Sequence, residues 1–446
     1  RFLRFKNARA SFFMDTLHKH RENHNVTSPN QFPDNYADDP TVAHILEQLR
    51  SDDPSPILVT GEAGTGKSTL VNYIRHYGGI ENTAILAPTG VAALNVGGQT
   101  IHSFFRFPFK IIDENALADQ RKNRLWKKVK LIIIDEISMV RADMLDGMDI
   151  ILRKAQDSAQ PFGGCKILLV GDFYQLPPVI PNHEKAVLGQ MGYAGPFAYH
   201  ANVLENYTPV HFELSKVYRQ RDPRFVEILS DLRLARNVVE AVGKLNEICV
   251  KPHRAGRTPV LLTSTNAIAE RYNKKGLLDL TSQALKYDCI TQGRFNANRA
   301  PAPMQSTLKK GARVMAVKND PLKRWVNGSL GTIVELNPKE VYVRFDGDTA
   351  SRKIESATWE SITYKWNEIE QKMEEEATAT FSQMPLILAW AVTIHKAQGL
   401  SLDDVRIDLG RGAFAPGQAY VALSRARTLE GLSLTAPLRA NDIQTR

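Results

Sequence analysis

One nine-residue stretch, G-E-A-G-T-G-K-S-T at 61–69, constrains the fold of this 446-residue chain more than any other. It follows a short apolar run at 57–59 and precedes Leu70, Val71 and Ile74, whose spacing suits one face of a helix. The predicted layout is therefore strand, glycine-rich loop and helix, which is the setting of a P-loop. The alternative is a glycine turn that only joins a strand to a helix.

Each residue type in this loop suits a nucleoside triphosphate. Glycines let the backbone turn without Cβ clashes and direct N–H groups at phosphate oxygens beside the positive end of the following helix. The lysine is expected to reach the β- and γ-phosphates, and the serine hydroxyl is expected to bind Mg²⁺. The candidate nucleotide-binding residues are Gly61, Gly64, Gly66, Lys67, Ser68 and Thr69.

Length, charge and cysteine content restrict the class of protein. The chain is long enough for roughly two to four domains. Its net charge of +9 favours a polyanionic partner, although charge alone would serve an anionic membrane surface equally. No stretch has the uninterrupted apolar length of a membrane span, so no membrane partner is expected. The 3 cysteines lack metal-ligand spacing, which indicates a reducing, intracellular compartment.

Residues 1–38 are expected to be irregular. The opening R-F-L-R-F-K-N-A-R-A is basic and amphipathic, so a targeting segment and a solvated lead-in are alternatives, and the acidic Asp15 and Glu22 that follow favour the lead-in. Asp39 and Pro40 then form the start signal of a helix that leads to the P-loop strand.

A pair of carboxylates follows the apolar strand predicted at 131–134. Asp135 and Glu136 stand at its carboxyl end, where a P-loop site needs one group to hold Mg²⁺ and another to orient and deprotonate the attacking water. In isolation the same dipeptide is equally compatible with a surface pair. Downstream of a complete P-loop, the site interpretation is favoured.

A further strand at 166–170 precedes G-D-F-Y-Q-L-P-P-V. Asp172 and Gln175 therefore lie at the rim where open α/β sheets bind ligands. A glutamine amide there can donate to a γ-phosphate and accept from water. The alternative is a connection stiffened by prolines with incidental polar residues.

Aromatic and basic residues alternate in T-I-H-S-F-F-R-F-P-F at 100–109. This pattern suits a single-stranded nucleic acid, because bases stack on rings at about 1 to 3 kcal/mol each while cations follow the backbone. The alternative, which is favoured for any one phenylalanine, is a place in the core. The preceding P-T-G at 88–90 offers small residues and a hydroxyl for a phosphate, and a polar, basic insertion follows at about 113–130.

A second α/β unit is predicted from about Pro209, without a glycine loop of its own. It begins with a strand at 209–214 and contains Arg219 in V-Y-R-Q. From about Gly311, closely spaced strand signals predict a small barrel of roughly five strands inserted in this unit. A glutamate-rich stretch near 370–376 is expected to return the chain to the sheet.

Two clusters close the chain. The first, T-I-H-K-A-Q-G, lies in a predicted loop between two strands. The second, Q-A-Y-V-A-L-S-R-A-R, is a predicted helix that ends in Arg425 and Arg427. Arginines at a helix carboxyl end ordinarily complement its dipole. In a unit that lacks a P-loop, we expect them instead to face the unit that has one.

These clusters, in this order, resemble the PIF-type (petite integration frequency) DNA helicases, relatives of the RecD-like and Dda helicases in superfamily 1B. The resemblance covers residues 58–432. It rests on motif I (G-E-A-G-T-G-K-S-T), motif Ia (A-P-T-G-V-A-A-L-N with T-I-H-S-F), motif II (I-D-E-I-S-M-V), motif III (G-D-F-Y-Q-L-P-P-V), motif IV (V-Y-R-Q), motif V (T-I-H-K-A-Q-G) and motif VI (A-Y-V-A-L-S-R-A-R).

The resemblance implies an α/β fold of two RecA-like domains with ATP and Mg²⁺ in the cleft. The first domain would span 39–205 with a strand-separating wedge at about 106–128, and the second 206–300 and 380–446 with an SH3-like barrel at 301–379. The implied catalytic residues are Lys67, Asp135, Glu136, Gln175, Arg219 and Arg425, with Gln398 and Gly399 as further nucleotide contacts. The implied DNA-binding residues are Pro88, Thr89, Gly90, His102, Phe104, Thr393, His395 and Lys396.

The implied activity is ATP-dependent unwinding of DNA by a monomer that moves 5′ to 3′ on single strands and forks, with G-quadruplexes as a further substrate. The alternatives are a superfamily 1 RNA helicase and an ATP-dependent clamp or switch. One departure concerns adenine: the family's upstream glutamine has only Gln48, at the far end of its helix, and the distant Gln31 as counterparts. The resemblance implies the cytoplasm or nucleoid of a bacterium, or a eukaryotic nucleus or mitochondrion.

Overall fold

The computed structural model describes residues 36, 39–113, 117, 123–251, 258–293, 295, 297, 300–322, 324–410 and 412–445. Outside the described residues lie Gln31 and almost all of the N-terminal segment expected to be irregular. Residues 114–116 and 118–122 of the expected wedge also lie outside them. The described residues form two parallel sheets and three antiparallel ones. No helix in the described part of the chain combines the length and apolar character that a membrane crossing requires.

The first unit is a six-stranded parallel sheet in the order β3-β2-β4-β5-β1-β6. Its central strand, L-I-I-I at 131–134, is buried at every position, which explains the unbroken apolar run. The strands are β1 (Ile57–Gly61), β2 (Thr83–Ala87), β3 (Gln99–Thr100), β4 (Leu131–Ile134), β5 (Lys166–Gly171) and β6 (Val210–Leu214). The carboxyl ends of β1, β4 and β5 are adjacent. They place the P-loop, the pair Asp135 and Glu136, and Asp172 on one edge of the sheet.

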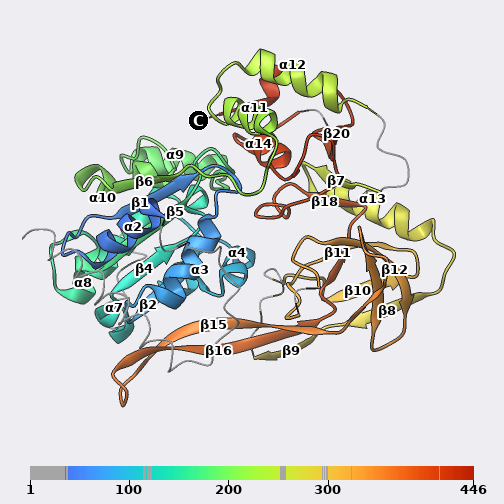
Figure 1. Ribbon diagram of the computed structural model, residues 1–446. Helices are drawn as coiled ribbons and strands as arrows, with labels where there is room; N and C mark the ends of the chain where they lie inside the picture. The colour runs from blue at the N-terminus through green and yellow to red at the C-terminus, as the bar shows by residue number, and fades with distance from the viewer. Residues whose placement is uncertain are drawn as a thin grey trace, which may run out of the picture.

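Helices cover both faces of this sheet (Figure 1). The helix predicted to start at Pro40 is confirmed, with Asp39 accepting from the Thr41 amide at 2.9 Å as its cap. The helices are α2 (Pro40–Arg50), α3 (Lys67–Tyr77), α4 (Gly90–Val96), α5 (Ile101–Phe104), α7 (Arg124–Lys128), α8 (Ala142–Gln156), α9 (Asn182–Gln190) and α10 (Asn202–Asn206).

The strand expected to open the second unit belongs instead to the first sheet. β6 pairs in parallel with β1 from Ile57–Val210 to Gly61–Leu214. Its alternating burial suits a sheet edge, and an apolar pattern does not encode which strand it pairs with. The chain therefore crosses to the second unit after Leu214.

The second unit is built on a four-stranded parallel sheet, β18-β7-β19-β20. Its strands are β7 (Val260–Thr263), β18 (Ala391–Thr393), β19 (Val405–Asp408) and β20 (Leu432–Leu434). Its helices are α11 (Pro223–Arg233), α12 (Val238–Cys249), α13 (Asn266–Leu278) and α14 (Gln418–Leu423). The helices and strands of the second unit form one buried apolar cluster, which also contains Ala63 and Leu176 of the first unit. The two units therefore pack together at the edge that carries the P-loop.

Antiparallel sheets separate β7 from β18 along the chain. One has five strands, β14-β13-β12-β11-β17, and the others are β10-β8 and β15-β16-β9. Their bounds are β8 (Ala284–Asp288), β9 (Ile290–Gly293), β10 (Gln305–Lys309), β11 (Arg313–Ala316), β12 (Leu330–Leu336), β13 (Val341–Phe345), β14 (Arg352–Ile354), β15 (Ala357–Asn367), β16 (Lys372–Gln383) and β17 (Leu386–Leu388).

The glutamate-rich stretch expected to be a simple return is the outer part of a long hairpin. β15 and β16 run from the antiparallel sheets to the first unit, below α7 and β2 in Figure 1. There Tyr364 is 4% exposed, packs edge-on against Phe104 at 5.9 Å and accepts from the Ile85 amide at 3.0 Å. Arg75 donates to Glu375 at 2.8 Å. The hairpin thus joins the antiparallel sheets to the first unit, in addition to the packing of the first unit against the second.

Candidate active site

The loop after β1 has the backbone geometry of a phosphate cradle. Gly64 and Gly66 have φ of 89° and 88°, a left-handed conformation that glycine adopts without steric cost. A Cβ on Gly61 would lie 2.5 Å from Thr65 Oγ1. Lys67 donates to the carbonyls of Gly61 at 2.7 Å and Glu62 at 2.8 Å, so its ammonium lies at the mouth of the loop.

Ser68 and Thr69 lie in the first turn of α3, directly after this lysine, and Ser68 is exposed. Burial lowers the pKa of Lys67, and the carboxylates of Asp172, Glu136 and Asp135 act against that shift. The ammonium therefore stands among the acidic groups that end β4 and β5.

Asp135 and Glu136 occupy the end of β4 as predicted. Asp135 is 5% exposed, and burial together with Glu136 raises its pKa to about 7. Burial also raises the pKa of Glu136, against the nearby Lys67 and Arg425. The buried Asp135 and the half-buried Glu136, beside these cations, form a site that suits a metal ion and a general base.

Gln175 and Gln398 meet at Glu136 from opposite units. The amide of Gln398 donates to Glu136 Oε2 at 3.0 Å and to Gln175 Oε1 at 3.5 Å. Gly399, which follows in the loop after β18, has φ of 81° and open space at its Cβ position. The two glutamines thus link three of the expected motifs at one carboxylate.

Both predicted arginines reach this edge from the second unit. Arg425 is 1% exposed, and burial lowers its pKa to about 10. Burial and the neighbouring Arg425 lower the pKa of Arg219 to about 9. Arg219 donates to the carbonyls of Ser424 and Gly399, at 3.2 and 3.1 Å, while its Nε is buried without a hydrogen-bond partner among the described residues.

The half-buried guanidinium of Arg219 and the buried guanidinium of Arg425 repel each other and disfavour the charged form of Arg219, which an anion between them would relieve. The structure thus brings together Lys67, Asp135, Glu136, Gln175, Arg219, Gln398 and Arg425.

Tyr218 is a candidate that the sequence interpretation missed, although it precedes Arg219 in V-Y-R-Q. Its amide donates to Gly64 O at 2.8 Å, and its ring, 42% exposed, lies 3.7 Å from the place of a Cβ on Gly66. Lys216 lies 5.1 Å above that ring. The signal available in the sequence was only an aromatic beside a motif arginine.

The expected nucleic-acid residues of the first unit lie around α4 and α5. Pro88 and Gly90 flank Thr89, which caps α4 by accepting from the Ala92 amide at 3.2 Å. Phe104 is 2% exposed and belongs to the core, which favours the structural interpretation of that ring. His102 instead stacks at 4.8 Å on Phe109, which is 77% exposed.

In the second unit, Thr393 ends β18 and accepts from the Lys396 amide at 3.4 Å. Lys396 is exposed, and burial lowers the pKa of His395. Gln48 donates to Asp53 at 2.9 Å on the far end of α2. No role for it at a nucleotide base follows from this contact.

The P-loop, the acid pair and the arginines of a second unit define a P-loop nucleoside triphosphatase with its site between two units. The family model for PIF1-like helicases matches residues 37–227. The ATP-dependent DNA helicase Pif1 of Bdellovibrio bacteriovorus is 33% identical over 405 residues, which are 89% of this chain and 87% of that protein. The chain therefore belongs to the PIF1-like helicase family.

Other relatives agree. The human ATP-dependent DNA helicase PIF1 is 34% identical over 84% of this chain, which spans 57% of the human protein. The crystal structure of Bacteroides Pif1 with ADP-AlF4 has a TM-score of 0.82 at 34% identity, covering 91% of this chain and 94% of that one. The same helicase bound to single-stranded DNA has a TM-score of 0.63 over 92% and 94%.

Proposed function

We propose that this chain is an ATP-driven DNA helicase that hydrolyses ATP between its two parallel-sheet units. The observation that carries the proposal is the convergence of Lys67 and Glu136 of the first unit with Arg219 and Arg425 of the second. Neither unit holds a complete hydrolytic set. Closure of the units about ATP therefore controls its cleavage.

In this mechanism the P-loop amides and Lys67 bind the β- and γ-phosphates. Glu136 takes a proton from the attacking water, and Gln175 orients that water. Arg219 and Arg425 neutralise charge on the γ-phosphate, a contribution of about 10³ to 10⁵ in rate for arginines of this kind. The Nε of Arg219, which has no hydrogen-bond partner in the part of the chain that the structure describes, supports this assignment, because a phosphate oxygen would satisfy it.

The donor set also fits Mg²⁺. A hydroxyl at the first turn of α3 and a buried carboxylate at the end of β4 are oxygen ligands of the kind that Mg²⁺ takes in P-loop enzymes. Ser68 and Asp135 would hold the ion, which would supply positive charge beside the phosphates as negative charge develops during hydrolysis.

Single-stranded DNA is the proposed track. The exposed stack of Phe109 on His102, the hydroxyl of Thr89 and the exposed Lys396 supply rings and donors on both units. Relatives solved with single-stranded and forked DNA support this choice. We propose that the five-stranded antiparallel sheet is an SH3-like domain that grips the strand, that the insertion after Phe109 is the wedge, and that movement is 5′ to 3′.

The test compares unwinding of forks that carry either a 5′ or a 3′ tail, with and without ATP. The wild type is expected to unwind only the 5′-tailed fork, and Lys67→Ala is expected to abolish hydrolysis and unwinding while single-strand binding persists. Hydrolysis retained by Lys67→Ala contradicts the proposed site.

Two further comparisons separate the alternatives. Stronger ATPase stimulation by poly-U than by poly-dT would indicate an RNA helicase, because a stacking groove does not by itself reject a 2′-OH. Hydrolysis without movement along DNA would indicate a switch. The exposed Tyr218 ring offers stacking to any base, so GTP should be compared with ATP.

A further inference from the structure

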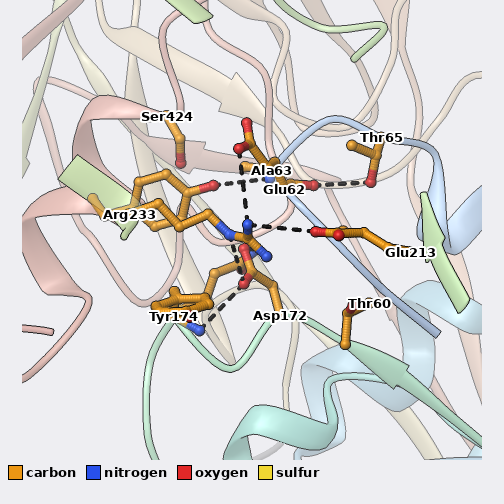
Figure 2. Close-up of polar contacts among 12 residues, drawn as sticks. Thr60, Glu62, Ala63, Thr65, Asp172, Tyr174, Glu213, Arg233 and Ser424 are labelled. Carbon is orange, nitrogen blue, oxygen red and sulfur yellow. Dashed lines mark hydrogen bonds and ion pairs between the residues drawn. The ribbon is translucent and has the colours of Figure 1, made fainter. Parts of the chain in front are cut away.

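Arg233, at the end of α11, is a buried cation that lies outside the motifs described above. Its side chain is 5% exposed, and its Nε donates to Asp172 Oδ1 at 3.1 Å. Glu62 and Glu213 lie 3.8 Å from its Nη1, and its guanidinium lies 4.7 Å from the centre of the Tyr174 ring. Figure 2 shows the guanidinium between these three carboxylates.

These contacts cross between units. The helix that carries Arg233 buries its apolar face in the second unit, through Phe225, Leu229 and Leu232. The carboxylates belong to the P-loop, the loop after β5 and the edge strand β6 of the first unit. Burial alone would lower the pKa of Arg233, but Asp172, Tyr420 and Glu62 together more than offset this, so its pKa lies above the usual value. The pair thus keeps both charges away from water.

Asp172 is fully buried, and its two carboxylate oxygens accept hydrogen bonds from different partners. Oδ1 accepts from Arg233 and from the Tyr174 amide, the latter at 3.2 Å. Oδ2 accepts from the Gln175 side-chain amide at 3.3 Å. Because Arg233 binds Oδ1, it neutralises the carboxylate and leaves Oδ2 for Gln175.

The chain of contacts continues to the catalytic carboxylate. With its Nε2 bound to Asp172, Gln175 directs Oε1 at Gln398, which donates to it at 3.5 Å. The same Gln398 amide donates to Glu136 at 3.0 Å. A path of four polar contacts therefore runs from Arg233 through Asp172, Gln175 and Gln398 to Glu136.

Two contacts of α14 and its N-terminal turn hold the same region. Tyr420 accepts from the Ala63 amide at 3.0 Å, beside the P-loop. A Cβ on Gly417 would lie 2.4 Å from Tyr174 O and 2.5 Å from Gln175 O. The backbone of the loop after β5 is thus confined by α14 and its N-terminal turn, while the side chains of Gln175 and Arg233 both donate to Asp172.

We propose that Arg233 is a positioning residue for hydrolysis: through Asp172 it sets the orientation of the Gln175 amide, and thereby the hydrogen bond that Gln398 donates to Glu136. The proposal rests on the proposed function, which supplies the reaction that these residues serve. Arg233 touches no reacting atom. Its removal acts on the rate of the chemical step rather than on binding of ATP.

The test is a double-mutant cycle between Arg233→Ala and Gln175→Ala, with single-turnover hydrolysis and steady-state kinetics on single-stranded DNA. Arg233→Ala is expected to lower kcat by as much as about 100-fold, the loss that a small misplacement of catalytic groups produces. KM for ATP is expected to stay unchanged, because ground-state binding is retained. In the Gln175→Ala background, Arg233→Ala is expected to have no further effect on hydrolysis.

Two variants of the same helix separate positioning from folding. Leu229→Ala truncates a side chain that is 4% exposed and makes no polar contact in the path, so it is expected to lower Tm and to leave kcat of the folded enzyme unchanged. Arg224→Ala removes an arginine that is 82% exposed, and is expected to change neither quantity. Where Arg233→Ala does not fold, Arg233→Lys keeps a charge beside Asp172 and is expected to retain an intermediate kcat with the same KM.

The outcomes distinguish the two proposals. Equal fractional losses of kcat in both backgrounds, an unchanged kcat in Arg233→Ala, or a raised KM at unchanged kcat overturns the positioning role. A wild type that hydrolyses ATP but does not unwind forks overturns the helicase proposal alone, since the cycle is measured on hydrolysis.

Discussion

Glu136 adopts an unusual backbone conformation for a non-glycine residue, with φ of 55° and ψ of 46° at the turn after β4. Such a conformation costs about 1 to 3 kcal/mol and persists where the surroundings enforce it. Here the turn aims the carboxylate at Gln398 and Arg425 of the other unit. The strain is thus located at the group assigned as the base.

Glu136→Gln is accordingly expected to lower kcat by about 10²- to 10⁴-fold, the usual contribution of a general base. Glutamine keeps the shape and can still bond Gln398, so binding of a fluorescent ATP analogue is expected to persist. Hydrolysis within about tenfold of the wild type would show that another group takes the proton.

His395 makes stability depend on pH. Burial lowers its pKa in the folded state, whereas the unfolded chain titrates near the ordinary value of about 6.5. The unfolded state therefore binds more protons as the pH falls, and the His395 contribution, complete above about pH 6.5, declines as the pH approaches the lower folded pKa. His395→Asn is expected to flatten this decline. The free energy of unfolding, measured by urea at about pH 7.5 and about pH 5.5, checks it; equal slopes in both proteins would contradict it.

Among single residues, those that belong to a local sequence motif, such as Lys67 and Glu136, could be predicted from the sequence. Residues whose importance comes from distant partners carried no pattern. In the sequence Arg233 looks like an ordinary last-turn arginine of a helix, and its three carboxylate partners lie on three other segments. Phe104 and Phe109 look alike in sequence, and only packing separates the buried ring from the exposed one.

Among the elements, the turn into α14 depends on a glycine. Gly417 has φ of 73° and its backbone touches the loop after β5. Gly410 has φ of 61° with nothing near its Cβ position, and so is a matched control. Gly410→Ala is expected to cost about 1 to 2 kcal/mol, from the left-handed backbone alone. Gly417→Ala is expected to cost more and to lower kcat, because the methyl group displaces the loop that carries Gln175.

Chemical unfolding and ATPase assays of the two variants provide the measurement. If Gly417→Ala and Gly410→Ala change stability and kcat equally, the close approach at Gly417 does not contribute to catalysis.

Strand and helix positions were largely predictable, because apolar periodicity and caps are local. The strand at 131–134 has the predicted bounds, and the helix predicted to start at Pro40 does so. Pairing was not predictable in the same way. β6 shows an edge-strand pattern that fits either sheet, and the long hairpin has a polar outer half that reads as a loop until its partner strand is known.

Across the whole molecule, the hairpin of β15 and β16 joins the antiparallel sheets to the first unit, and Tyr364 is the buried ring at that contact. Tyr364→Ala removes a buried ring and leaves the Ile85 amide without this acceptor, so a loss of about 3 kcal/mol or more is expected. Hydrogen exchange at the Ile85 amide and protease cleavage within 357–383 are expected to increase.

Lys365→Ala is the control, since Lys365 neighbours Tyr364 on the same strand and pairs with Glu376 on the exposed face. It is expected to leave exchange and cleavage unchanged. Equal protection in the wild type and Tyr364→Ala would show that the docked tyrosine does not hold the hairpin in place.

The docked hairpin also affects the binding of any ligand that needs the surface beneath it. It covers α4, α5 and α7, and its ring closes part of the first unit's core. A ligand that required this surface would bind only those molecules in which the hairpin had undocked. Its apparent Kd is therefore raised by the docking equilibrium constant, so that each 1.4 kcal/mol, approximately, of docking free energy weakens binding about tenfold. Substitutions at Tyr364, remote from the P-loop, can thus tune affinity without touching the ligand.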